Sequence, residues 1–261
     1  MTESFDTKLL PDALLHDLGV TEPSEIDLDV LAWRVGATVR RHRLRDCEAR
    51  VTGFNDRAII TVTDNVAPTR QRFSIAHELG HWYHHRGYAL TCRSVEIGSA
   101  DAARNDAERV ADRYAADLLM PAYLFHARLK AAKASDWTGV RAVAKEFCVS
   151  PLAAAIRIIE SDRYPLLLVC HDAQGRRWFK AANSLQGRCF PRPDLDSDTP
   201  AFALLYGHRE QQKPCSSPGL TWFERGLASQ IPVQEHSMSD GNSIYTLLLL
   251  NTKDLDRRAS R

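Results

Sequence analysis

The spacing of hydrophobic residues predicts two short amphipathic helices at the start of the chain. Apolar positions recur every three or four residues across 8–18 and again across 27–35. Asp27 precedes the second run as a candidate N-cap, and Gly36 follows it as a candidate end.

The period then shortens to two, which predicts strands. Val39 alternates with charged residues in 37–44, and short β-like runs follow at 51–54 and 58–62. We expect a small antiparallel sheet with helices over one face. The arginine-rich residues 40–45 suit a solvated edge strand protected by charge better than a nucleic-acid-binding patch.

Helical spacing returns at Pro68 and continues to Gly87. Residues 87–103 show no clear period, which predicts a loop near the preceding helix, and this loop is a candidate lid. A long helix is expected from Arg104 to Met120, because Pro121 stops it. Its predicted buried face consists of Ala107, Val110, Ala111, Tyr114, Ala115, Leu118 and Leu119.

Residues 137–159 predict two helices joined by a tight turn at 148–150, a helix-turn-helix-like pair. Ser150 is the expected cap of the second helix. That helix offers few side chains able to read base edges, apart from Arg157, so a packing role is favoured over DNA binding.

The last hundred residues predict a separate α/β module. Strands are expected at 165–170, 176–182 and 244–251, with one short helix around 202–206 in a proline-rich interval. The charged tail from Thr252 should be frayed. The sequence does not identify what such a module binds.

Composition excludes several classes of protein. The 261 residues are 44% hydrophobic, and 34 Lys plus Arg balance 33 Asp plus Glu, so no global charge draws the chain to nucleic acid or membrane. No basic, apolar leader and no run of roughly 20 apolar residues is present, so we expect a cytoplasmic protein. Six cysteines without a C-x-x-C pair suggest neither a disulfide framework nor a cysteine-based zinc site.

The stretch His77-Glu78-Leu79-Gly80-His81 is the strongest chemical signal in the chain. On a helix, His77 and His81 lie one turn apart on the same face and can share a metal ion. Glu78 is offset by one residue, where it can accept a proton from a water at the metal. His84 and His85 are further candidates, but histidines at a helix end are more often simply exposed.

A third ligand is needed from elsewhere in the chain. Catalytic zinc usually has three protein ligands, and Glu108 lies near the start of the next predicted helix. Asp112, one turn later, could accept the other ring N–H of a ligating histidine. On spacing alone, both residues could equally be exposed helix charges.

The two motifs together resemble the ImmA/IrrE family of bacterial metallopeptidases. QRFSIAHELGH (residues 71–81) is followed by ERVADRYAADLLMP (residues 108–121), and the family often has Asn where this chain has Asp112. The resemblance implies His77, His81 and Glu108 as metal ligands and Glu78 as the catalytic carboxylate. Zinc is the expected ion, with manganese or iron as alternatives.

The resemblance also implies an α+β fold in three parts. These are a mainly helical, zincin-like metallopeptidase domain with the small sheet (1–130), the helix-turn-helix-like segment (131–163) and the C-terminal α/β module (164–261). That last module could be a GAF-like sensor or a small sheet that completes the core.

The implied function is cleavage of a partner repressor, itself a helix-turn-helix protein, to release stress-response or mobile-element genes. Two alternatives remain open: a regulator that binds a repressor or DNA around a structural metal without cutting, and a component of a toxin–antitoxin or prophage pair. DNA binding is expected to be weak or absent.

Overall fold

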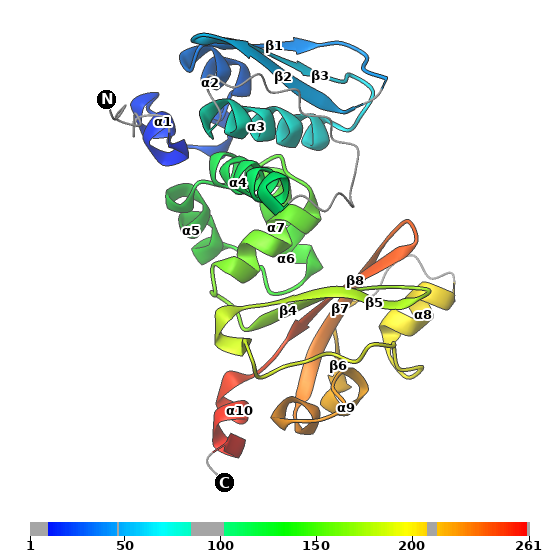
Figure 1. Ribbon diagram of the computed structural model, residues 1–261. Helices are drawn as coiled ribbons and strands as arrows, with labels where there is room; N and C mark the ends of the chain where they lie inside the picture. The colour runs from blue at the N-terminus through cyan, green and yellow to red at the C-terminus, as the bar shows by residue number, and fades with distance from the viewer. Residues whose placement is uncertain (1–9, 46, 85–101, 208–212, 260–261) are drawn as a thin grey trace. The chain divides into compact units, whose positions relative to one another are not determined.

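The computed structural model describes residues 10–45, 47–84, 102–207 and 213–259 (Figure 1). The fold is α+β, as predicted. Contacts divide the chain into two compact units, Met1–Ala127 with Lys145–Ser150, and Arg128–Ala144 with Pro151–Arg261. The expected loop at 87–103 lies outside the described residues, except that its last two positions already belong to a helix.

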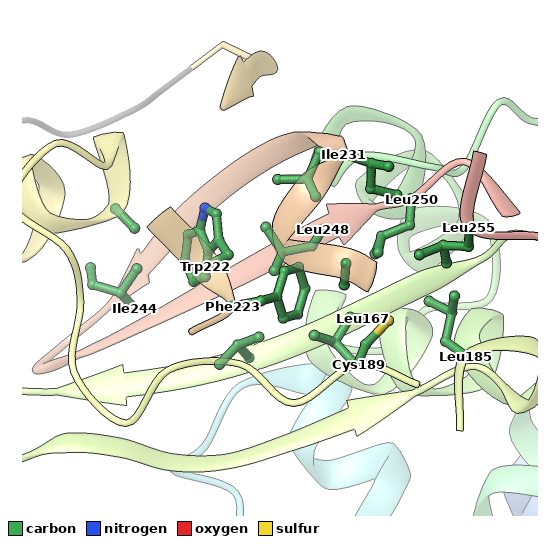
Figure 2. Packing of buried hydrophobic residues seen from close by; sticks show 14 of the residues in the cluster. Leu167, Leu185, Cys189, Trp222, Phe223, Ile231, Ile244, Leu248, Leu250 and Leu255 are labelled. Carbon is green, nitrogen blue, oxygen red and sulfur yellow. The ribbon is translucent and has the colours of Figure 1, made fainter. Parts of the chain in front are cut away.

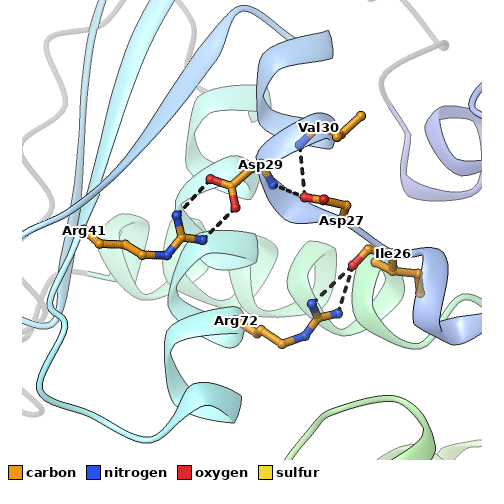
Figure 3. Close-up of polar contacts among 6 residues, drawn as sticks. All are labelled: Ile26, Asp27, Asp29, Val30, Arg41 and Arg72. Carbon is orange, nitrogen blue, oxygen red and sulfur yellow. Dashed lines mark hydrogen bonds and ion pairs between the residues drawn. The ribbon is translucent and has the colours of Figure 1, made fainter.

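Helices make up most of the first unit. Asp27 caps the second helix as predicted, because its carboxylate accepts hydrogen bonds from the amides of Asp29 and Val30 at 2.9 and 3.3 Å (Figure 3). Val110, expected to be buried, is instead 41% exposed, since it lies at the margin of the apolar stripe. The helices are α1 (Pro11–Asp17), the 3₁₀ helix η2 (Pro23–Glu25), α2 (Leu28–Arg34), α3 (Pro68–His84), α4 (Ala102–Leu119) and α5 (Ala122–Ala131), of which the last four residues belong to the second unit.

The small sheet is mixed, and the expectation of a wholly antiparallel sheet was wrong in this respect. Its strands β1 (Ala37–Arg41), β2 (Ala49–Phe54) and β3 (Arg57–Val62) lie in the order β1-β3-β2. A tight turn, with Asn55 at φ 52°, makes β2 and β3 antiparallel neighbours. The free edge of β3 is left for β1, which pairs in parallel. Alternation of apolar residues defines strand faces but not strand partners.

The two faces of this sheet differ in chemistry. One face packs on α3 through residues such as Val51 and Ile60, and Arg41 on the same side forms a two-bond ion pair with Asp29 of α2 (Figure 3). We call the other face the outer sheet face. It consists of Thr38, Arg40, Arg50, Thr52, Phe54, Arg57, Ile59 and Thr61.

The predicted helix-turn-helix-like pair is present as α6 (Trp137–Glu146) and α7 (Pro151–Glu160), with Cys148 at φ 52° in the turn. The apolar positions of α7 are largely buried, and Arg157 is only 9% exposed. This burial agrees with a packing role for α7.

The second unit is built on an antiparallel sheet of five strands in the order β5-β4-β8-β7-β6. The three predicted strands are confirmed as β4 (Leu166–Asp172), β5 (Gly175–Ala181) and β8 (Ser243–Leu249). The prediction missed β6 (Cys215–Pro218) and β7 (Pro232–Asp240). The inward positions of β7 include Glu235 and Ser237, so its sequence lacks the apolar alternation that indicates a strand.

Aromatic and aliphatic side chains fill the core of this second unit (Figure 2). Trp222 and Phe223 lie over Leu167 and Leu248 of the sheet. The remaining helical segments are η3 (Asn183–Leu185), α8 (Pro200–Tyr206), α9 (Gly219–Trp222), η4 (Leu227–Gln230) and α10 (Thr252–Ala259). The short helix expected at 202–206 is therefore confirmed as part of α8.

The charged tail is helical, which corrects the expectation that it is frayed. Asn251 accepts a hydrogen bond from the amide of Lys253 at 3.1 Å and so caps α10. Leu255 is 0% exposed and anchors the helix in the core (Figure 2). In the described part of the chain, no helix has both the length and the hydropathy needed to span a membrane.

Candidate metal centre

The site begins with the packing of α3 between the small sheet and α4. Gly80 allows α3 and α4 to pack closely against each other. A Cβ atom added at Gly80 would lie 2.9 Å from the Cα atom of Ala111 in α4. Such an approach requires glycine. Glu108 and Asp112 flank Ala111 on α4, so the crossing brings both carboxylates to the histidines of α3.

Three predicted ligands converge at this crossing. The Nε2 atom of His77 lies 3.0 Å from Nε2 of His81 and 3.1 Å from Oε2 of Glu108. His81 Nε2 lies 3.5 Å from Oε1 of the same carboxylate. One potential ligand atom from each residue falls within 4.8 Å of the others, a spacing at which a single ion can contact all three.

Asp112 orients the first histidine. Its Oδ1 atom lies 2.9 Å from Nδ1 of His77, which places the ring proton on Nδ1 and leaves the Nε2 lone pair toward the cluster. Burial disfavours the protonated form of His77, but the hydrogen bond and charge of Asp112, together with the charges of Glu78 and Glu108, outweigh it and raise the pKa. This is the contact expected for Asp112 from its spacing.

Glu78 lies beside the cluster in a different environment. It is 2% exposed, and its Oε2 atom has no hydrogen-bond partner among the described residues. Burial raises the pKa of this carboxyl to about 7, although the charge of His77 and the backbone of Val51 in β2 act in the opposite direction. A carboxyl with a pKa near neutrality can both accept and release a proton.

The donor set fits a divalent transition metal. Two imidazole nitrogens and one carboxylate suit zinc, and also manganese or iron. Glu108 keeps 40% of its side chain exposed, whereas His81 keeps 2%, so the cluster is open on the Glu108 side within the described residues.

All five predicted site residues are therefore brought together: His77, Glu78, His81, Glu108 and Asp112. His84 instead packs its ring edge-on against Tyr83 and Tyr114. His85 lies outside the described residues.

The prediction missed how the sheet supports the site. Gly53 of β2 lies against the ring of Trp82, where an added Cβ would approach a ring carbon to 2.3 Å. The Trp82 indole donates a hydrogen bond to the Val35 carbonyl at 2.9 Å. A glycine inside a strand next to an apolar helix is the signal that could have indicated this contact.

Comparison with known proteins gives a family and a structural neighbour. The model of peptidase family M78, described as the IrrE N-terminal-like domain, matches residues 25–158. A solved structure entitled "Mycobacterium tuberculosis transcriptional regulator" superposes with a TM-score of 0.62 at 14% identity, covering 97% of this chain and 78% of that one. No curated protein sequence gives a significant match.

Proposed function

Because the chain belongs to the family of IrrE N-terminal-like domains, we propose that it is a metal-dependent endopeptidase whose substrate is a transcriptional repressor. The observation that carries this proposal is the convergence of His77, His81 and Glu108 within 4.8 Å, with Glu78 next to them. This arrangement has the parts required for hydrolysis of a peptide bond by an activated water.

Each residue has a distinct task in the proposed reaction. His77 and His81 would bind the ion through Nε2, Glu108 would bind it through a carboxylate oxygen, and Asp112 keeps His77 in the correct tautomer. When bound, a divalent ion supplies Lewis-acid polarisation of the scissile carbonyl and lowers the pKa of water. Zinc is the ion we expect.

Glu78 is the proposed general base. Its Oε2 atom, free of hydrogen bonds among the described residues, takes the proton of the attacking water and returns it to the nitrogen of the leaving amine. Asp112 is unsuited to this task because its carboxylate accepts a hydrogen bond from Nδ1–H of His77, on the side of the ring away from the cluster.

The proposed substrate rests on the regulatory context of the family. The structural neighbour is by its title a transcriptional regulator, which supports a role in gene control but, at 14% identity, shows only a shared fold. We propose that cleavage inactivates a helix-turn-helix repressor and releases stress-response or mobile-element genes.

A Glu78→Gln substitution tests this function. We expect cleavage of a purified helix-turn-helix repressor to fall by about 10²–10⁴-fold, because the amide cannot accept the proton. Metal content, measured by mass spectrometry, should stay the same. The matched control is Glu224→Gln, at an exposed position in the second unit.

Cleavage by Glu78→Gln at the rate of the unsubstituted protein would exclude the proposed mechanism. Binding of the repressor with no cleavage by either protein would favour the non-cleaving regulator.

A further inference from the structure

The outer sheet face carries a positive charge that the proposed peptidase reaction does not use. Its charged residues are Arg40, Arg50 and Arg57, one from each strand. Within the described residues, none of the three forms an ion pair. Arg41, one residue along β1, points to the other face and is neutralised by Asp29 at 2.6 Å.

The register of the strands places these groups in rows across the sheet. Arg40 on β1 and Arg50 on β2 are both paired with Thr61 of β3, so the three residues form one row across the sheet. Neighbouring strands are about 4.8 Å apart, so the two arginines are separated by about 10 Å at the backbone. That spacing allows them to bind different phosphates of one strand.

An aromatic ring lies on the same face. Phe54 is 81% exposed, and it lies opposite Arg57 at the end of the β2–β3 hairpin. The only other large apolar side chain of the outer sheet face is Ile59, at 38% exposure. Thr38 and Thr52 lie on either side of Ile59 and add hydroxyl donors.

We propose that the outer sheet face, with Arg40, Arg50, Arg57 and Phe54, is a binding site for single-stranded nucleic acid. Guanidinium groups form paired hydrogen bonds with phosphate oxygens, and threonine hydroxyls donate to the same oxygens. The exposed ring of Phe54 offers a surface on which an unpaired base stacks.

The chemistry of the outer sheet face favours single-stranded nucleic acid over an acidic protein and over duplex DNA. Two apolar side chains are too few for the hydrophobic core of a stable interface with an acidic protein. The bases of duplex DNA are paired and stacked on one another, whereas a stacking contact with the exposed ring of Phe54 requires an unpaired base.

The site continues past the end of β1, and the proposal therefore departs from the expectation that the arginines of residues 40–45 only protect an edge strand. Arg43 and Arg45 follow in the next residues, and both are exposed. Among the described acidic residues nearby, Glu48 is held by Arg70 at 2.5 Å, Asp56 lies in the hairpin turn, and Asp64 follows the end of β3, so five arginines face two carboxylates without an ion pair. The local charge is therefore positive although the chain carries a net charge of only +1.

The test is fluorescence anisotropy of the full-length protein with a labelled oligothymidine of about 20 nucleotides, at several salt concentrations. We expect the triple variant Arg40→Ala/Arg50→Ala/Arg57→Ala to bind at least tenfold more weakly. The slope of log affinity against log salt should fall by about 2, because each single-strand phosphate contact contributes about 0.7. Phe54→Ala should weaken binding about fivefold or more with an unchanged salt slope, because it removes only stacking.

The matched control makes the same change of net charge elsewhere. Arg177, Arg225 and Arg257 are exposed residues of the second unit, and replacing all three by alanine should leave oligothymidine binding unaltered. A triple Arg→Lys variant at positions 40, 50 and 57 retains the charge and should bind more tightly than the triple alanine variant. Circular dichroism and thermal melting verify the fold of each variant.

Three results would overturn the inference. They are no oligothymidine binding at about 50 mM salt, equal binding by the outer-face and control triple variants, and equally effective competition by a polyglutamate peptide of the same charge. The last result would assign the face to an acidic protein.

Discussion

Single residues differ in how firmly their surroundings define their role. Asp112 is placed by one hydrogen bond to Nδ1 of His77, so it acts on the proposed metal only through that ring. Glu78 is defined by burial, which shifts its pKa to about 7. In the second unit, His171 is also buried, at 1% exposure, and burial lowers its pKa although the backbone of Arg192 and the charges of Asp194 and Asp172 favour its charged form.

Asp112→Ala should weaken metal binding without removing a ligand. Loss of a partner that orients a ligating histidine typically costs about 10–100-fold in metal affinity. Competition with a chromogenic chelator measures the affinity. Asp112→Asn should lose less metal affinity, because an amide oxygen also accepts a hydrogen bond from Nδ1–H of His77. Equal metal affinity in the unsubstituted protein and both variants would contradict the orienting role.

His171 should make the stability of the protein depend on pH. Burial lowers its pKa from 6.5, so the unfolded chain binds a proton below that pH while the folded chain does not. The folded state is therefore fully favoured above pH 6.5 and loses stability as pH falls toward the folded pKa.

Urea unfolding at two pH values tests this effect. Between about pH 7.5 and 5.5 the free energy of unfolding of the unsubstituted protein should fall by up to about 1.4 kcal/mol more than that of His171→Leu. The other titrating groups contribute equally to both proteins. An identical loss for both proteins would show that His171 is protonated equally in the folded and unfolded states.

At the scale of elements, the candidate metal centre forms where α3 packs across α4. His77, Glu78 and His81 occupy one turn of α3, but Glu108 and Asp112 come from α4 and reach them because Gly80 and Ala111 are in close contact. The sheet supports α3 from its other side, through Gly53 against Trp82. The geometry of the site therefore depends on two glycines that carry no chemistry themselves.

Gly80→Ala should damage the metal site even though alanine favours a helix. The added methyl group would lie 2.9 Å from a backbone atom of α4, which cannot move aside alone, so the helices must separate and carry Glu108 away from the histidines. Overpacking of this kind costs about 1–3 kcal/mol, against about 1 kcal/mol gained in helix propensity.

Thermal melting and metal titration check both consequences of Gly80→Ala. Thr69→Ala in the first turn of α3 is the control, since it removes atoms rather than adding them. Unaltered metal affinity in Gly80→Ala would mean that the α3–α4 distance does not control the site.

At the scale of the whole chain, two compact units divide the proposed tasks. The metal centre and the outer sheet face belong to the first unit, while the second contains the five-stranded sheet and its own aromatic core. The chain's membership of the IrrE N-terminal-like family rests on residues 25–158, which include all five residues of the candidate metal centre.

Added zinc should stabilise the elements that hold it. At a free concentration 100 times its dissociation constant, a ligand specific for the folded state contributes about 2.7 kcal/mol. Hydrogen exchange measured by mass spectrometry should show slower exchange in peptides from α3 and α4, with β4 and β8 as internal references. Unchanged exchange in α3 and α4 would contradict metal binding by these helices, and His77→Ala should abolish the effect.

The sequence by itself determined the features that depend on near neighbours along the chain. His77 and His81 share a helix face because they are four residues apart, and the motif predicts Glu78 beside them. Apolar periodicity and caps likewise predicted α2, α3, α4, β4, β5 and β8, because these signals lie within single elements.

Only the tertiary structure decided how distant segments meet. It placed β1 parallel to β3, made a strand of the polar β7, and anchored α10 through Leu255. It also brought Glu108 within 3.1 Å of His77, which spacing alone left open against an exposed helix charge. Strand pairing and helix crossing depend on which surfaces exclude water together, and a pattern read along one segment contains no information about its partner.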